Sequence, residues 1–171
     1  WLAEQLASIA AQTHTEWICM ITLDSPLEEI RSSPDLASFM HDERFVWVEN
    51  PERLGVRSNF QKATQLLLER DVDLIAFSDQ DDVWLPEKIA ESVAAIKARG
   101  PLSMVYCDAY LLVEGVTRPE RLHEYTVRTR GEMSIGEQII SPQVSGFCEV
   151  FDATLAKLHP TIPTESTDHD H

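Results

Sequence analysis

The sequence predicts an α/β domain in which helices flank a mainly parallel sheet. Short apolar runs alternate along the chain with longer segments whose apolar residues recur every three or four positions, the patterns of buried strands and amphipathic helices. This alternation favours strand–helix–strand units with parallel strands. One apolar run ends in a cluster of aspartates, and open α/β sheets bind their ligands at that end of their strands.

Four apolar runs have the length of buried strands, and polar or turn-forming residues bound them. They cover residues 17–23, 45–48, 72–77 and 102–107. We expect these four strands to form one sheet. After the last of them, residues 109–116 predict a small excursion that turns at Glu114-Gly115 and comes back on itself.

Six segments are expected to be helical. They are residues 2 to about 12, residues 27–40 with a break at Pro34, the segment after Gly55, residues 86–99, and two short segments at 135–140 and 153–158. Gly55 suits a backbone turn with positive φ, and Pro86 is expected at the first position of its helix. Asp152 can cap the last helix.

Composition limits the classes of function. The 171 residues are 43% hydrophobic and 25% charged, which is ordinary for one globular domain. The 29 acidic and 14 basic residues give a formal charge of −15, which argues against nonspecific nucleic-acid binding and a polybasic membrane anchor. No apolar run approaches the roughly 20 residues that cross a bilayer, and no signal peptide is visible. Cys19, Cys107 and Cys148 are expected to be reduced core residues of a cytoplasmic protein.

The aspartate cluster lies between the strand at 72–77 and the helix expected from Pro86. Asp79, Asp81 and Asp82 put three carboxylates within four residues. This crowding is costly unless a cation neutralises it, and hard divalent ions such as Mg²⁺ or Mn²⁺ take oxygen ligands of this kind. The alternative is an acidic, solvated turn that helps to start the next helix.

Residues 77–88 read Phe-Ser-Asp-Gln-Asp-Asp-Val-Trp-Leu-Pro-Glu-Lys and resemble the Asp-x-Asp segment of family 2 glycosyltransferases. These are bacterial enzymes of GT-A fold, rhamnosyltransferases among them, that decorate surface polysaccharides. Further stretches in the family's order extend the resemblance over nearly the whole chain: Gln12-Thr13 before Trp17, Asn50 to Phe60, Val105 to Asp108, and Val144 to Phe151. The resemblance implies a GT-A fold in which Asp79, Asp81 and Asp82 hold a divalent metal, Mg²⁺ or Mn²⁺, on the diphosphate of a nucleotide-sugar.

The same resemblance implies substrate contacts at Asp24, Arg57, Asp79 and Asp108. Asp24, in Leu23-Asp24-Ser25-Pro26, matches an acidic group that contacts the nucleotide base where the family carries Asp-Asp-Gly-Ser. A turn or helix cap is the alternative for Asp24, and a surface arginine near a helix start is the alternative for Arg57. Asp108 closes a strand near the expected active site, with a simple strand-end turn as its alternative.

The catalytic base implied by the resemblance is Asp170. Family members carry a late His-Asp or Glu-Asp pair whose carboxylate takes the acceptor's proton, and His169-Asp170 fits that motif. An aromatic residue usually follows, where this chain has His171. The alternatives are adventitious metal binding by these groups and a chain end without a catalytic role.

The expected function is transfer of a hexosyl or rhamnosyl group from a UDP- or dTDP-sugar to a hydroxyl of a saccharide or lipid-linked acceptor, with inversion at the anomeric centre. We expect a single catalytic domain over residues 1–171, a fragment without the family's first strand and its C-terminal continuation. It would act in the cytoplasm or at the inner face of the membrane, without nucleic acid. The rivals are a noncatalytic nucleotide-sugar-binding or scaffold domain and a nucleotidyltransferase.

Overall fold

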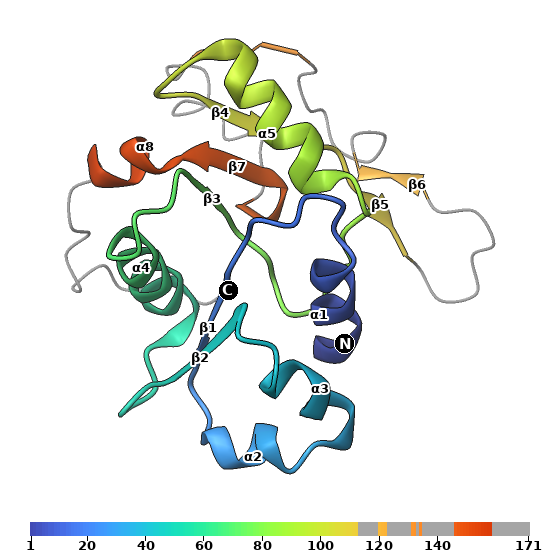
Figure 1. Ribbon diagram of the computed structural model, residues 1–171, viewed down its shortest axis with the longest axis vertical. Coiled ribbons are helices and arrows are strands. Elements are labelled where there is room, and N and C mark those ends of the chain that lie inside the picture. The colour runs from blue at the N-terminus through green and yellow to red at the C-terminus, as the bar shows by residue number, and fades with distance from the viewer. Residues whose placement is uncertain (113–119, 123–130, 133, 135–145, 159–171) are drawn as a thin grey trace.

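Two groups of hydrogen-bonded strands form the middle of the molecule. The computed structural model describes residues 1–112, 120–122, 131–132, 134 and 146–158. In the first group, β1 (Cys19–Leu23) runs parallel to β2 (Phe45–Glu49), with Cys19 opposite Phe45 and Leu23 opposite Glu49. In the second, β7 (Glu149–Asp152) lies between β3 (Leu74–Ala76) and β4 (Met104–Tyr106) and is antiparallel to both (Figure 1).

The strands confirm the α/β class and change its detail. Because β3 and β4 both oppose β7, they run in the same direction, as the prediction of a mainly parallel sheet requires. The expected single sheet is wrong in one respect: among the described residues, no backbone ladder joins β1 and β2 to the group of β3, β7 and β4. A short antiparallel pair joins β5 (Tyr110–Leu111) to β6 (Glu120–Arg121), and the turn predicted at Glu114-Gly115 lies outside the described residues.

The helices lie close to their predicted positions. They are α1 (Leu2–Ala10), α2 (Leu27–Arg31), α3 (Ala37–Met40), α4 (Gly55–Leu68), α5 (Lys88–Arg99) and α8 (Ala153–Leu158), with 3₁₀ turns η1 (Pro34–Leu36) and η2 (Gly146–Cys148). The break at Pro34 is confirmed, because η1 separates α2 from α3. Asp152 caps α8 by accepting the Thr154 N–H at 2.7 Å. The helix expected at 135–140 lies outside the described residues.

Gly55 and Pro86 show how local chemistry sets helix starts. Gly55 has a φ of +76° and begins α4, as predicted. The prediction that Pro86 is the first residue of its helix is wrong, since α5 begins two residues later at Lys88. The Pro86 carbonyl instead accepts the backbone N–H of Thr13 at 2.9 Å, which holds this turn against the segment that follows α1. Among the described residues, no helix is both long and apolar enough to span a bilayer.

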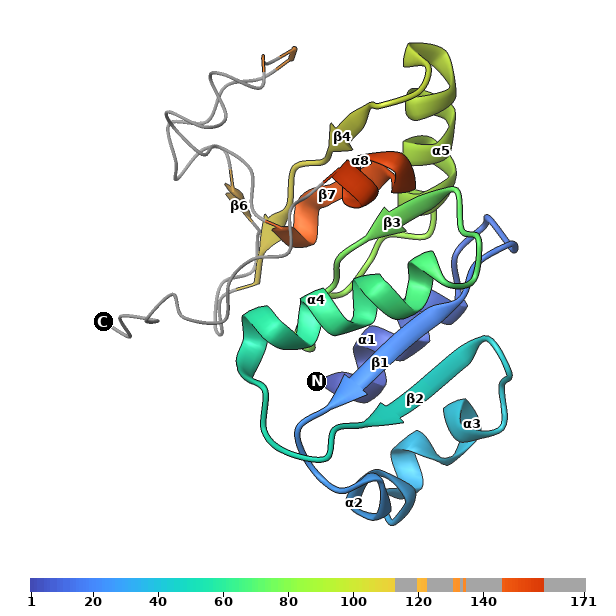
Figure 2. The same ribbon diagram turned by 90° about the vertical axis from the view of Figure 1, so that its left-hand side faces the viewer.

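Helices α1 and α4 lie on opposite sides of β1 (Figure 2). The apolar stripe of α1 packs against β2 and η1, where Leu6, Ile9, Leu36 and Phe45 form a buried cluster. Between β1 and β3 lies a cavity of about 1290 Å³, walled by these strands and by α1 and α4. Asp79, Gln80 and Asp81 also line the cavity, so the aspartate cluster borders the space between the two strand groups.

Candidate functional site

The aspartate cluster forms a tight turn directly after β3. We call residues 77–82 the acidic loop. The Asp82 N–H donates to the Asp79 carbonyl at 3.3 Å, which closes a turn over Gln80 and Asp81. The Asp82 carboxylate in return accepts the Asp79 N–H, also at 3.3 Å. The loop is therefore shaped by its own backbone and by one of its three carboxylates.

Helix α1 holds the acidic loop and the segment after it. Gln5, which is 6% exposed, donates to the Ser78 hydroxyl at 2.7 Å and to the Asp79 carbonyl. Further along the helix, the Ser8 hydroxyl accepts the Trp84 N–H at 2.9 Å. These bonds fix the backbone of the loop at both ends of its turn.

A second buried glutamine extends this contact to the start of α5. Gln12 is 5% exposed, donates to the Leu85 carbonyl at 2.8 Å and accepts the Ile89 N–H at 3.0 Å. Gln5 was not predicted from the sequence, and Gln12 was identified only as part of a stretch that matches the family. The available signal was their position beside Leu6 and Ile9, on the buried side of the helix expected at residues 2 to about 12, where an amide needs polar partners.

Two carboxylates of the acidic loop are harder to ionise than ordinary aspartates. Burial is the main cause that raises the pKa of Asp79, and the Asp81 charge adds to it. Burial also raises the pKa of Asp82, together with the charges of Asp79 and Asp81, while the Asp79 N–H and Lys88 oppose the shift. Carboxylates that raise one another's pKa are stabilised in their charged form by a nearby cation.

The chemistry of the acidic loop fits a divalent cation that is shared with a ligand. Among the described residues, no three His, Cys, Asp or Glu side chains are grouped to hold a metal ion by themselves. Mg²⁺ at phosphate-binding sites commonly takes one or two carboxylates and completes its shell with phosphate oxygens and water. Asp79, Asp81 and Asp82 suit that arrangement better than an all-protein cage.

Asp24 is hydrogen-bonded to the start of α4. Its carboxylate accepts the Leu54 N–H at 3.1 Å, the Gly55 N–H at 2.9 Å and the Asn50 side-chain N–H at 2.7 Å. These bonds lower the pKa of Asp24, with the Leu54 N–H contributing most. This geometry is that of the helix cap left open as an alternative, and a contact of Asp24 with a base stays a prediction.

A polar network connects Asp24 to the cavity. Asn50 is 8% exposed, and its side-chain N–H also donates to the Asn59 side-chain oxygen at 2.7 Å. The Lys62 ammonium donates to the Asn50 side-chain oxygen at 2.6 Å. Asn59 lines the cavity that Asp81 also lines. Asn50 and Asn59 were identified from the sequence only as part of a stretch that matches the family. Lys62 was not identified.

The structure groups some of the predicted site residues and separates others. Asp79 and Asp81 line the cavity, whereas Asp24, Arg57, Asp82 and Asp108 are not part of its lining. Arg57 is exposed in the first turn of α4. Asp108 follows β4, and its carboxylate accepts the Ala109 N–H at 3.0 Å. Asp170 lies outside the described residues, and the roles of all seven residues stay predictions.

Lys88 and Glu149 are two further charged residues near the acidic loop and β7. The Lys88 ammonium donates to the Phe147 carbonyl at 2.6 Å and lies 4.3 Å from the centre of the Trp84 ring. Burial lowers the pKa of Lys88, and the charges of Cys107, Cys148 and Asp82 oppose that shift. Burial raises the pKa of Glu149 at the start of β7. From the sequence, Lys88 was expected in the helix at 86–99 and Glu149 in a stretch that matches the family. Neither assignment indicated that these charged side chains would be partly buried.

Comparison with protein-family models gives a match over most of the chain. The family model described as Glycosyl transferase family 2 matches residues 1–159, which include every helix and strand named above. No curated protein matches the chain.

Proposed function

The chain belongs to glycosyl transferase family 2 and has the GT-A fold of a glycosyltransferase, and we propose that its acidic loop is the centre of a nucleotide-sugar donor site. The observation that carries the proposal is the position of Asp79 and Asp81, which follow β3 directly and line the cavity beside α4. Ligands of open α/β sheets bind at this end of the strands. The donor would be a UDP- or dTDP-sugar, and the transferred group a hexose or rhamnose.

Asp79, Asp81 and Asp82 would hold Mg²⁺ or Mn²⁺, which when bound supplies positive charge that stabilises the leaving diphosphate. Gln5 of α1 has a different role from the three aspartates. Because Gln5 binds Ser78 and the Asp79 carbonyl, the loop is fixed before the donor arrives and loses little conformational freedom on binding. Arg57, in the first turn of α4, is the proposed contact for the diphosphate or base.

The acceptor is proposed to be a saccharide or lipid-linked hydroxyl in surface polysaccharide synthesis, in the cytoplasm or at the inner face of the membrane. Asp170 would take the hydroxyl proton as that oxygen attacks the anomeric carbon in line with the leaving group. A single displacement of this kind inverts the anomeric centre. A general base must come within hydrogen-bond reach of its hydroxyl, directly or through one water.

Binding without transfer is the second candidate. One observation favours it: the Asp24 carboxylate, expected at the nucleotide base, is hydrogen-bonded to the start of α4. A donor-binding domain needs the acidic loop and no base, so the two candidates differ in what Asp170 does.

The test measures donor binding and sugar transfer separately. UDP- and dTDP-sugars are titrated calorimetrically with Mn²⁺ and with EDTA, and transfer is followed by release of the nucleoside diphosphate with candidate acceptors. We expect binding that EDTA abolishes. Equal affinity for the donor with Mn²⁺ and with EDTA would contradict the donor site proposed here.

Transfer by the wild type distinguishes the two candidates, and replacement of the proposed base then tests the role of Asp170. Asp170→Asn should reduce transfer by about a hundredfold or more, the scale usual for a positioned base, and leave donor affinity unchanged. Asp168→Asn in the same segment is the matched control and should keep transfer near the wild-type rate. Transfer by Asp170→Asn at the wild-type rate would show that another group takes the proton.

A further inference from the structure

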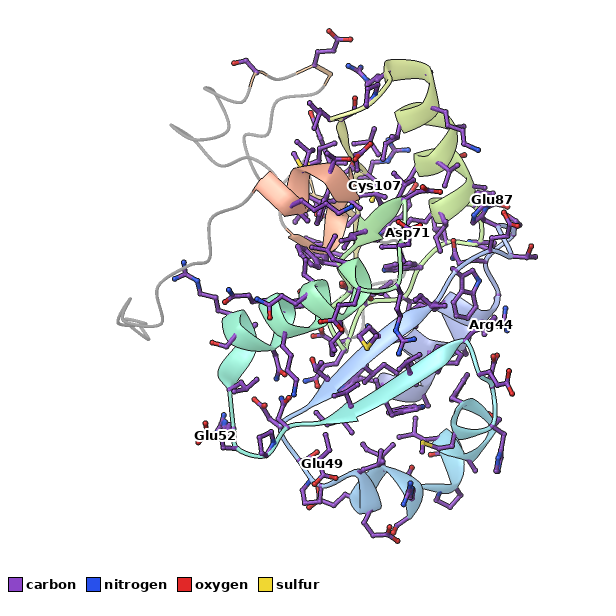
Figure 3. All side chains as sticks on the ribbon, turned by 60° about the vertical axis from the view of Figure 1, so that its left-hand side comes forward. Arg44, Glu49, Glu52, Asp71, Glu87 and Cys107 are labelled. Carbon is purple, nitrogen blue, oxygen red and sulfur yellow. The ribbon has the colours of Figure 1, made fainter. Side chains whose placement is uncertain are left out.

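Cys107 and Cys148 lie opposite each other where β4 and β7 end their pairing. The ladder pairs Val105 with Val150 and Tyr106 with Glu149, so the next step of the register pairs Cys107 with Cys148. The Cys107 N–H donates to the Cys148 carbonyl at 3.1 Å, which continues the ladder to this pair. Figure 3 shows Cys107 beside β7.

The backbone geometry of this pair suits a covalent bond between the two sulfurs. Hydrogen-bonded partners in an antiparallel ladder have Cα atoms about 5.5 Å apart and side chains on the same face. Disulfides span Cα distances of about 4.4–6.8 Å. Cys107 is already one residue beyond the regular part of β4, so its backbone can adjust to bring the sulfurs together.

The two thiols have complementary surroundings. Cys107 is exposed, which corrects the expectation that all three cysteines are core residues, whereas Cys148 is 2% exposed. A hydrogen bond from the Cys148 thiol is the main cause that lowers the pKa of Cys107 to about 6, and the Lys88 charge also lowers it. Burial and the Asp108 charge oppose this shift. The lowered pKa gives Cys107 more of the thiolate, the nucleophilic form of cysteine, than an ordinary thiol has at neutral pH.

Cys19 provides an internal contrast. Burial raises the pKa of this thiol to about 12, so Cys19 is protonated at any physiological pH. It lies on β1, in the other strand group. One chain therefore carries an exposed reactive thiol with a buried partner, and an inert thiol for comparison.

We propose that Cys107 and Cys148 form a reversible disulfide, with Cys107 as the attacking thiol and Cys148 as the resolving thiol. The oxidant is a small-molecule disulfide. The Cys107 thiolate attacks one of its sulfurs, breaks the S–S bond and releases one thiolate. Cys148 then loses its proton and attacks the Cys107 sulfur of the mixed disulfide, which releases the second thiolate. The two protein thiols are oxidised by two electrons, and the small disulfide is reduced to two thiols.

The Cys107–Cys148 disulfide would act close to the acidic loop. It removes the thiolate charge that faces Lys88, and the Lys88 ammonium is hydrogen-bonded to the carbonyl of Phe147, the residue directly before Cys148. Lys88 is also the cation that opposes the raised pKa of Asp82. The disulfide itself does not depend on the proposed sugar transfer, so its test is independent of that proposal. Disulfides in cytosolic proteins are usually transient and redox-sensing, which is the role proposed here.

The test uses the reduced full chain with oxidised glutathione at neutral pH. The protein is then denatured, free thiols are alkylated, the chain is digested with trypsin without reduction, and the peptides are identified by mass spectrometry. Trypsin can cleave after Arg121, Arg128 and Arg130, so Cys107 and Cys148 fall on separate peptides unless they are bonded. We expect these two peptides to be linked, the link to disappear with dithiothreitol, and Cys19 to be alkylated.

Three variants assign the roles. Cys148→Ala should stop at a glutathione mixed disulfide on Cys107, and Cys107→Ser should leave Cys148 unmodified. Cys19→Ala is the matched control and should form the link as the wild type does. Separate alkylated peptides from the oxidised wild type, or a bond between two molecules through Cys107, would overturn the proposal.

A second measurement does not depend on how the variants fold. In the wild type at pH 7, iodoacetamide should label Cys107 at least about tenfold faster than Cys19, because only the thiolate reacts. Equal labelling rates would contradict the assignment of Cys107 as the attacking thiol.

Discussion

Asp24 and the acidic loop differ in how the protein treats a carboxylate. Asp24 accepts two backbone N–H groups and an Asn50 amide, and its pKa is lowered. In the acidic loop, burial and neighbouring charge raise the pKa of Asp79 and Asp82. The protein therefore stabilises the ionised form of Asp24, whereas the ionised forms of Asp79 and Asp82 in the acidic loop carry an energetic cost. Costly charge at the end of a strand is the expected signature of a site that a ligand completes.

The largest expected effect is a loss of donor binding when the acidic loop is changed. Asp81→Asn removes one charge from the acidic loop and should weaken Mn²⁺-dependent donor binding at least about tenfold, the loss usual when a partner of a bound metal is removed. The measurement is calorimetric titration of the donor with Mn²⁺. Asp35→Asn, which removes an exposed charge in η1, is the matched control and should bind as the wild type does. Unchanged affinity in Asp81→Asn would place the metal elsewhere.

Asp24 should instead affect stability. Asp24→Ala removes the cap of α4 and should lower the free energy of unfolding by about 1 kcal/mol, the usual value for a helix cap. Because the pKa of Asp24 is lowered in the folded state, its charge stabilises the fold above its unfolded pKa of about 4, and that contribution disappears as pH falls through the folded pKa.

Urea denaturation of wild type and Asp24→Ala at pH 7 and pH 3 measures this contribution. The difference in stability between the two proteins should be larger at pH 7. A difference that grows toward pH 3 would contradict the capping role of the ionised carboxylate.

The smallest expected effect is a gain of stability, opposite in sign to the effect of Asp24→Ala. Asp82→Asn removes a partly buried charge that repels Asp79 and Asp81, while the asparagine oxygen can still accept the Asp79 N–H. The melting temperature in EDTA at pH 7 should rise by about 2 °C, which corresponds to under 1 kcal/mol in a domain of this size. A fall of several degrees would mean that the charge of Asp82 stabilises the fold, and the contrast with Asp24 would be lost.

Local patterns predicted the features that depend on neighbouring residues. The helix break at Pro34, the positive φ of Gly55 and the cap at Asp152 are all confirmed. Each follows from residues within about two helical turns, where spacing and backbone preference decide the structure.

Features that depend on distant partners were not predictable. The roles of Gln5 and Gln12 require partners more than seventy residues away. The reversed direction of β7 and the exposure of Cys107 depend on how β4 and β7 meet in the fold. The family resemblance, now shown over residues 1–159, supplied the fold but not these contacts.

The bonds that join α1 and Gln12 to the acidic loop and to the segment after it also bear on the order of folding. They join residues 73 to 77 positions apart, so each closes a long loop and carries a large entropic cost before it forms. Contacts of this kind slow folding, whereas α1 and the turns around it can form from local interactions. During synthesis α1 leaves the ribosome well before the acidic loop, so Gln5 and Gln12 reach their partners only after β3 and the loop have been made. The native position of the acidic loop therefore depends on contacts that close more than seventy residues of chain.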